Sequence, residues 1–152
     1  MESENIEINL CMMAAGQGTR ADFVKGMHKG LYPIQNTPAI IAIIDSVRRF
    51  TSNGLKVNKL VIAVGNKADQ VKQLLTHIWD KNIACKDIAL EFVQVDKLTG
   101  PKSGPGRSLY CCRHKLQGTP FIFTSVDTIL KSDCLRKEQF DESWIGVDYV
   151  DS

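Results

Sequence analysis

A stretch of small residues near the amino terminus is followed by a cluster of basic ones. The run AAGQGT at residues 14–19 leaves an apolar segment, and Arg20, Lys25 and Lys29 come after it. Small side chains let a backbone approach a bulky ligand, and successive N–H groups can then form an anion-binding nest. Because positive charge surrounds this nest, the stretch predicts a phosphate-binding loop. A plain turn between a strand and a helix is the alternative.

Two familiar phosphate-binding motifs fit this stretch less well. A P-loop needs Lys-Ser/Thr to close its GxxxxGK pattern, and none follows here. Residues 16–21 match the dinucleotide fingerprint GxGxxA, but that motif requires a helix at once, and glycines and a proline interrupt residues 26–33. The second predicted strand also ends in VGNK at residues 64–67, without a carboxylate to hold a ribose. A dinucleotide-dependent oxidoreductase is therefore the least favoured function.

The elements that must position these residues alternate between strand-like and helix-like segments. Apolar runs predict strands at residues 6–13, 59–64, 90–95 and 120–126, with a further candidate at 144–150. Helical spacing predicts helices at residues 38–50, 68–79 and 108–116, the first with Thr37 as N-cap and Pro38 at its first position. This alternation predicts an α/β, Rossmann-like three-layer sandwich, whose mostly parallel sheet carries helices on both faces. Ligands bind such sheets at the carboxyl ends of the strands.

The composition is that of an ordinary globular protein. The 152 residues fit one domain, 1–152, with 43% hydrophobic and 24% charged residues. A formal net charge of +2 is too small to indicate nucleic-acid binding, and the apolar runs are too short to span a membrane. Five cysteines without a CxxC pair, and the lack of a signal peptide, predict reduced thiols in a cytoplasmic protein.

Two segments together resemble the signature of the nucleotidyltransferases that make nucleotide sugars and related activated metabolites. They are LCMMAAGQGTR at residues 10–20 and HKGLYPIQNTPAI at residues 28–40. The pattern of this family is an apolar strand, A-A/G-G-x-G-x-R, a loop, and a lysine followed by an apolar segment and G-x-P. The resemblance covers nearly the whole chain. It departs at His28, where the family usually has proline before the lysine, a variant similar to phosphocholine cytidylyltransferases. Asn36-Thr37 also replaces a glycine before Pro38.

The resemblance implies a reaction in which a nucleoside triphosphate is joined to a phosphorylated acceptor and pyrophosphate is released. Arg20 would bind the departing β- and γ-phosphates through its bidentate fork, and Lys29 the α-phosphate. Asp127, directly after a predicted strand, would hold Mg²⁺, although a turn or N-cap aspartate is the alternative. The resemblance implies nucleotide contacts at Ala14, Ala15, Gly16, Gly18, Thr19, Gly65, Gly104, Gly106 and Ser108.

Several other residues have two interpretations each. LTGPKSGPGRSLY, residues 98–110, is by itself a flexible surface loop, whereas the resemblance implies that its second half recognises the base. Arg107 would add a phosphate contact or face solvent, and Lys25 is best explained as a solvated loop charge. CCRH at residues 111–114 suggests a metal site, but adjacent cysteines on a helix point apart, so packing is preferred. His28 is expected to be structural or exposed.

The family usually takes a second metal carboxylate and the acceptor pocket from a later half of the fold. This chain ends near where the middle strand of that fold would lie, so we expect a fragment of a longer protein or a reduced form. Asp148 and Asp151 are the late candidates for the missing carboxylate. An unpaired sheet edge at residues 144–150 would favour self-association, and hence a homo-oligomer.

Two classes of function remain open from the sequence. The first is an enzyme whose phosphorylated small-molecule acceptor is a sugar 1-phosphate, or next a phosphocholine-like alcohol phosphate. The second is a nucleotide-sensing or assembly module that keeps the nucleotide loop and lacks the acceptor half. The residues do not name the base.

Overall fold

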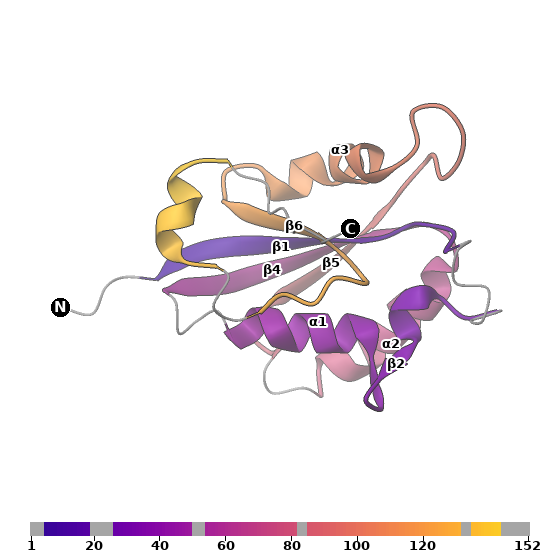
Figure 1. Ribbon diagram of the computed structural model, residues 1–152, viewed down its shortest axis with the longest axis horizontal. Helices are drawn as coiled ribbons and strands as arrows, with labels where there is room; N and C mark the ends of the chain where they lie inside the picture. Colours follow the sequence, from indigo (N-terminus) through magenta and orange to yellow (C-terminus); the bar gives the residue numbers. More distant parts are fainter. Residues whose placement is uncertain (1–4, 19–25, 50–53, 82–84, 132–134, 144–152) are drawn as a thin grey trace, which may run out of the picture.

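Four parallel strands form the central sheet of the computed structural model over the residues that it describes, 5–18, 26–49, 54–81, 85–131 and 135–143. Their order across the sheet is β5-β4-β1-β6 (Figure 1). The strands are β1 (Ile6–Ala14), β4 (Leu55–Val64), β5 (Ala89–Gln94) and β6 (Phe121–Ser125). Because all four run in one direction, their carboxyl ends meet at a single edge of the sheet.

Helices cover both faces of this sheet. α1 (Ala39–Arg48) and α2 (Ala68–Trp79) lie on one face, and α3 (Pro105–Leu116) lies on the other (Figure 1). The α/β fold with a parallel sheet between two helical layers, predicted from the alternation of elements, is confirmed. None of the helices within the described ranges has the length and apolar character needed to cross a membrane.

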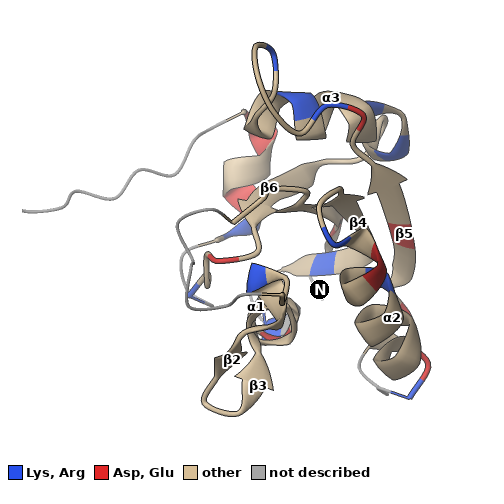
Figure 2. Ribbon diagram, turned by 90° about the vertical axis from the view of Figure 1, so that its right-hand side faces the viewer, with Lys and Arg blue, Asp and Glu red and all other residues tan. Residues whose placement is uncertain are grey.

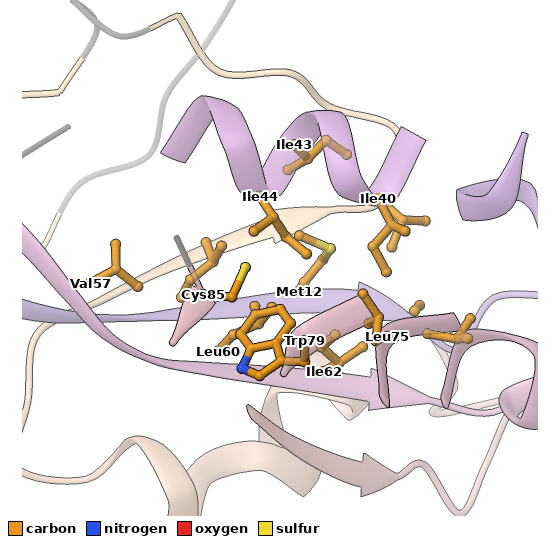
Figure 3. Packing of buried hydrophobic residues seen from close by; sticks show 14 of the residues in the cluster. Met12, Ile40, Ile43, Ile44, Val57, Leu60, Ile62, Leu75, Trp79 and Cys85 are labelled. Carbon is orange, nitrogen blue, oxygen red and sulfur yellow. The ribbon is translucent and has the colours of Figure 1, made fainter. Parts of the chain in front are cut away.

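The sheet packs against the helices through two separate apolar clusters. Successive side chains of a strand point to opposite faces, so Leu10 and Met12 of β1 join the cluster beneath α1 and α2, whereas Cys11 joins the one beneath α3. Figure 3 shows Ile43 of α1 above the sheet and Leu75 of α2 beside it. Each such buried aliphatic side chain stabilises the fold by about 1.5–3 kcal/mol. Because both faces of the sheet are packed, the strand ends from which the loops at the carboxyl edge begin are held in place.

A short hairpin directly precedes the first helix and overlaps the predicted helix, residues 38–50, only at Pro38. β2 (Pro33–Ile34) pairs antiparallel with β3 (Thr37–Pro38). The two residues between them, Gln35 and Asn36, have positive φ of 49° and 66°, as tight hairpin turns require. The helix consequently begins at Ala39, and the prediction that Thr37 caps it is wrong because this residue belongs to the hairpin.

The other element bounds differ from the predictions mainly at their ends. α2 spans residues 68–79 as predicted. α3 begins at Pro105 rather than Ser108, because proline is well suited to the first position of a helix. β4 begins at Leu55, before the predicted residue 59, since Ile6 to Ile8 of β1 give it partners there. The candidate strand at 144–150 lies outside the described residues.

Candidate functional site

A cleft of about 310 Å³ opens at the carboxyl edge of the sheet. Figure 2 looks onto this edge, with α3 above the sheet and α1 and α2 below it. The cleft is bordered by the ends of β1 and β6, the segment after β5 and the first turn of α3. Its lining includes six residues that the sequence placed at the nucleotide site: Ala15, Gly16, Lys29, Gly104, Ser108 and Asp127.

Lys29 and Asp127 meet inside this cleft. The Lys29 Nζ lies 2.7 Å from Oδ2 of Asp127, and the Ser125 hydroxyl donates a hydrogen bond to the other carboxylate oxygen. Burial raises the pKa of the Asp127 carboxyl, but the bonds from Lys29 and Ser125 outweigh this and hold the pKa below its usual range. Asp127 is therefore ionised at neutral pH, and its side chain is still 59% exposed. It can accept a cation from the cleft.

His28 is a buried structural residue beside this pair. Only 2% of it is exposed. Its Nε2–H donates to the Ala14 carbonyl over 2.8 Å, and its Nδ1 accepts from the Gly30 N–H over 3.0 Å. Because one ring nitrogen must donate and the other must accept, the imidazole is neutral. Burial lowers the pKa of His28, and the charges of Lys29 and Lys67 lower it further against the opposing bond to Ala14. The sequence expectation of a structural role is consistent with this burial.

An ion pair joins the two ends of the glycine-rich segment that borders the cleft. The Arg107 Nε donates to Asp96 Oδ1 over 2.8 Å, and its Nη2 donates to Oδ2. The Arg107 guanidinium lowers the pKa of the exposed Asp96 carboxyl to about 2. The ion pair therefore holds together the two ends of the segment at residues 97–104. Arg107 is engaged with a carboxylate, a third arrangement beside the phosphate contact and the solvent-facing side chain that the sequence allowed.

The turn after β4 supports the cleft from beneath rather than lining it. The Asn66 N–H donates to the Ala15 carbonyl over 3.2 Å. A Cβ on Gly65 would lie 2.4 Å from Leu98 Cδ2 and 2.9 Å from the Ala15 carbonyl oxygen. Only glycine fits between these two groups. Gly65 therefore lets the Leu98 segment pack directly over the loop after β1.

The remaining predicted residues lie in different places. Ala14 is buried and offers its carbonyl to His28, while Gly18, with φ of +65°, lies beside the Lys29 side chain. Gly106 is exposed in the first turn of α3. Several positions lie outside the described residues: Thr19, Arg20, Lys25, Asp148 and Asp151. No group of three or more His, Cys, Asp or Glu side chains gathers as a metal site in the described part of the chain.

The structure adds residues that the sequence reasoning missed. Lys97 and Ser125 line the cleft, the first just after β5 and the second at the end of β6. Both follow the rule that ligands bind beyond the carboxyl ends of strands, so a search of every strand end would have found them. Cys112 is buried in the cluster under α3, as the packing interpretation of the CCRH segment expected. A larger hollow of about 560 Å³ borders Trp79 and Phe92, and none of the predicted site residues lines it.

The fold of this chain is similar to the folds of solved nucleotidyltransferases. A UDP-glucose pyrophosphorylase complexed with UDP-glucose matches with a TM-score of 0.61 and 15% identity over 80% of this chain and 46% of that one. The Acinetobacter baumanii UDP-glucose pyrophosphorylase matches with a TM-score of 0.60 and 15% identity, over 85% of this chain and 48% of that one. The inositol-1-phosphate CTP transferase from T. maritima matches with a TM-score of 0.58 and 16% identity, over 85% of this chain and 47% of that one.

These matches rest on structure and not on close sequence relationship. No protein-family model and no curated protein sequence matches the chain. The chain spans about half the length of the three solved proteins. The chain has the fold of the nucleotidyltransferases.

Proposed function

We propose that this chain is the nucleotide-binding part of a nucleotidyltransferase, which joins a nucleoside triphosphate to a phosphorylated acceptor and releases pyrophosphate. The observation that carries the proposal is the cleft in which Lys29 and Asp127 face each other beside the loop at residues 14–18. A cation, a carboxylate and a stretch of nearly bare backbone are what a triphosphate with its metal ion requires.

The reaction needs positive charge more than it needs a base. The acceptor phosphate is already ionised near neutral pH, so its oxygen can attack without losing a proton. Two polyanions must approach, and negative charge builds on the α-phosphate and on the departing pyrophosphate. Lys29, whose side chain is 28% exposed in the cleft, would bind the α-phosphate. Arg20 remains our candidate for the β- and γ-phosphates.

Asp127 is suited to hold Mg²⁺. Magnesium is commonly bound through one or two carboxylates, with phosphate oxygens and water completing its shell. Asp127 supplies an ionised, half-open carboxylate in the cleft, and the neighbouring Ser125 hydroxyl orients it. When bound, the ion would neutralise the phosphates and orient them for transfer. Within the described residues Asp127 provides the first of the two carboxylates such a site would use.

The other end of the cleft would hold the base and ribose. Its walls come from Gly104, Ser108 and the segment after β5, and Leu98 adds an apolar surface there. A flat, partly apolar base fits between such walls, with backbone groups near Gly104 reading its edge. Two of the solved neighbours named above are UDP-glucose pyrophosphorylases and the third is an inositol-1-phosphate CTP transferase. We therefore propose a sugar 1-phosphate as the acceptor and a phosphocholine-like alcohol phosphate as the second choice.

Calorimetry tests the ligand class. The four ribonucleoside triphosphates, dTTP and NAD are titrated with and without Mg²⁺. We expect one triphosphate to bind in a Mg²⁺-dependent way and more tightly than its nucleoside. Asp127→Asn should remove most of the Mg²⁺ dependence, whereas Asp141→Asn, an exposed carboxylate in the 3₁₀ turn at residues 137–141, should retain it. Metal-independent binding of NAD in preference to every triphosphate would contradict the proposal.

Pyrophosphate release tests the reaction. The complete protein that contains this chain is incubated with the preferred triphosphate, Mg²⁺ and sugar 1-phosphates or phosphocholine. We expect pyrophosphate release with one acceptor class. Tight triphosphate binding without release for any acceptor would replace the enzyme with the nucleotide-sensing module.

A further inference from the structure

The segment before Lys29 is held by the amino-terminal part of α2. The Gln70 side chain makes two bonds to it: Oε1 accepts from the His28 N–H, and Nε2 donates to the Gly26 carbonyl, each over 2.7 Å. Lys67 adds a third bond, from its Nζ to the Met27 carbonyl over 2.9 Å. The amide orientation of Gln70 is fixed, because an N–H can only donate and a carbonyl can only accept.

This contact replaces the partners that regular secondary structure would supply. Gly26, Met27 and His28 lie outside any strand or helix, and Gly26 has φ of +81°. The carboxamide of Gln70 offers one acceptor and one donor side by side, as the backbone of a neighbouring strand would. The backbone of this segment is therefore hydrogen-bonded by the side chain of Gln70, which lies 42 residues after His28 in the chain.

Lys29 is consequently fixed from two directions. The His28 ring anchors the segment to the end of β1 through Ala14, and Gln70 anchors the same residue's backbone to α2. Lys29 follows directly, and its Nζ reaches Asp127. Without the bonds to α2, the backbone of residues 26–28 would lose its anchors on that side, and the His28 ring and the 3₁₀ turn that follows would remain to hold Lys29. Gln70 is not among the residues that line the cleft, and its bonds described above reach the backbone of Gly26 and His28, so its effect on Lys29 passes through the backbone.

We propose that Gln70 is a positioning residue, which holds the backbone of residues 26–28 so that the Lys29 ammonium stays in the cleft. Misplacing a reacting or binding group by about 1 Å can cost as much as 100-fold in rate. That Lys29 binds phosphate rests on the function proposed above. That Gln70 sets the position of Lys29 is a property of the fold alone, so each statement has its own test.

The first experiment observes Lys29 directly, without any nucleotide. The whole chain is reductively methylated with ¹³C-formaldehyde, which keeps lysine charged, and the Lys29 signal is assigned from its loss in Lys29→Arg. Asp127→Asn shows where this signal lies when the ion pair is broken. We expect Gln70→Met to move the signal toward that position. Gln73→Met, an exposed glutamine one turn further along α2, should leave it in place. An unmoved signal in folded Gln70→Met would overturn the proposal.

Methionine is unbranched and a good helix former, so Gln70→Met should preserve α2. Circular dichroism checks this. If the variant does not fold, Gln70→Glu is used instead, which keeps the acceptor for the His28 N–H and loses the donor to the Gly26 carbonyl. The same shift of the Lys29 signal is then expected, and its absence would overturn the proposal equally.

The second experiment asks whether Gln70 acts through Lys29. The affinity for the Mg²⁺-triphosphate complex is measured in a double-mutant cycle. Gln70→Met should weaken binding about tenfold, the scale of one charge-assisted hydrogen bond. In a Lys29→Ala background the same change should weaken it less than twofold. Equal losses in both backgrounds would show that Gln70 acts elsewhere. If the wild-type chain binds no triphosphate, the proposed function fails while the Lys29 signal still decides the role of Gln70.

Discussion

Lys29 and Asp127 are 98 positions apart in the chain, and their charged groups lie 2.7 Å from each other. The lysine comes from a 3₁₀ turn, Lys29–Leu31, and the aspartate follows β6. Each neutralises the other in the cleft. A polyphosphate entering there would compete with Asp127 for the lysine, while a metal ion would compete with Lys29 for the carboxylate.

Removing the charge of Lys29 should therefore affect transfer more than binding. Loss of one preorganised donor to a developing charge typically lowers turnover by roughly 10²–10³-fold. We expect a reduction of that size in pyrophosphate release for Lys29→Ala in the complete protein, with a smaller loss of triphosphate affinity. Lys131→Ala, an exposed lysine after β6, serves as the control and should behave as wild type. Normal turnover of Lys29→Ala would remove this residue from the proposed site.

The Asp96–Arg107 pair should be visible in an acid titration. The pKa of Asp96 is held at about 2, below its ordinary value of about 3.9. A lowered carboxyl pKa contributes stability that is present above the ordinary value and is lost as the pH falls toward 2. NMR titration of the Asp96 side-chain carbon should give a midpoint near 2 in wild type and a higher one in Arg107→Gln. Arg113→Gln, whose guanidinium stacks on Tyr110, should leave the Asp96 midpoint unchanged.

His28 should make the fold less stable in mild acid. Its pKa is lowered, chiefly by burial, so the unfolded chain takes up a proton at a higher pH than the folded chain does. The stability from neutral His28 is complete above about pH 6.5 and decreases as the pH falls toward the folded-state pKa. Urea unfolding at pH 7.5 and 5.5 measures this loss. His28→Gln should reduce the pH dependence, because an amide does not titrate in this range, while its donor and acceptor can keep the bonds to Ala14 and Gly30. His77→Gln, on the exposed surface of α2, serves as the control substitution.

Gly65 and Gly106 should respond in opposite ways to alanine. The Cβ of Gly65→Ala would collide with Leu98 and the Ala15 carbonyl, and such overpacking costs about 1–3 kcal/mol. A Cβ on Gly106 meets nothing within 4 Å and lies in the first turn of α3, so this substitution should be neutral or stabilise the fold by about 0.4–1 kcal/mol. Urea unfolding free energies compare the two. Equal stability of Gly65→Ala and wild type would mean that the Leu98 segment does not pack as described.

The regular part of the fold could be predicted because its signals are local. α2 was found with its bounds, since an amphipathic period over twelve residues leaves little choice. The hairpin at residues 33–38 could not be found in the same way, because its pairing comprises only two residues on each side. Pro38 also resembles a helix start. The helix thus begins at Ala39, one residue after the predicted start, because Pro38 pairs in the hairpin.

The sequence indicated which edge of the sheet carries the site, but not which side chains contact one another there. The rule that ligands bind beyond parallel strand ends placed Asp127 at this edge, whereas Lys29 was placed there by the resemblance to the nucleotidyltransferase signature. Their ion pair depends on the order of strands, which places β6 directly beside β1 and is not written in either segment. Gln70 gave no signal at all, because a polar residue on an amphipathic helix normally faces water. Its partners are backbone groups, which every residue possesses.

The central position of β1 has a consequence for the order of events during synthesis. Of the four strands β1 is made first and its two neighbours later, and Asn9, which pairs with Lys59 of β4, gains its partner in β6 only when Phe121 has been made. Pairing across such long stretches of chain is slow, because a large loop must close before any contact is gained. Lys29 therefore has no Asp127 to pair with until β6 and the residues after it have been made. A nascent chain that still lacks β6 has the glycine loop and the lysine, but it lacks the wall of the cleft that Ser125 and Asp127 supply.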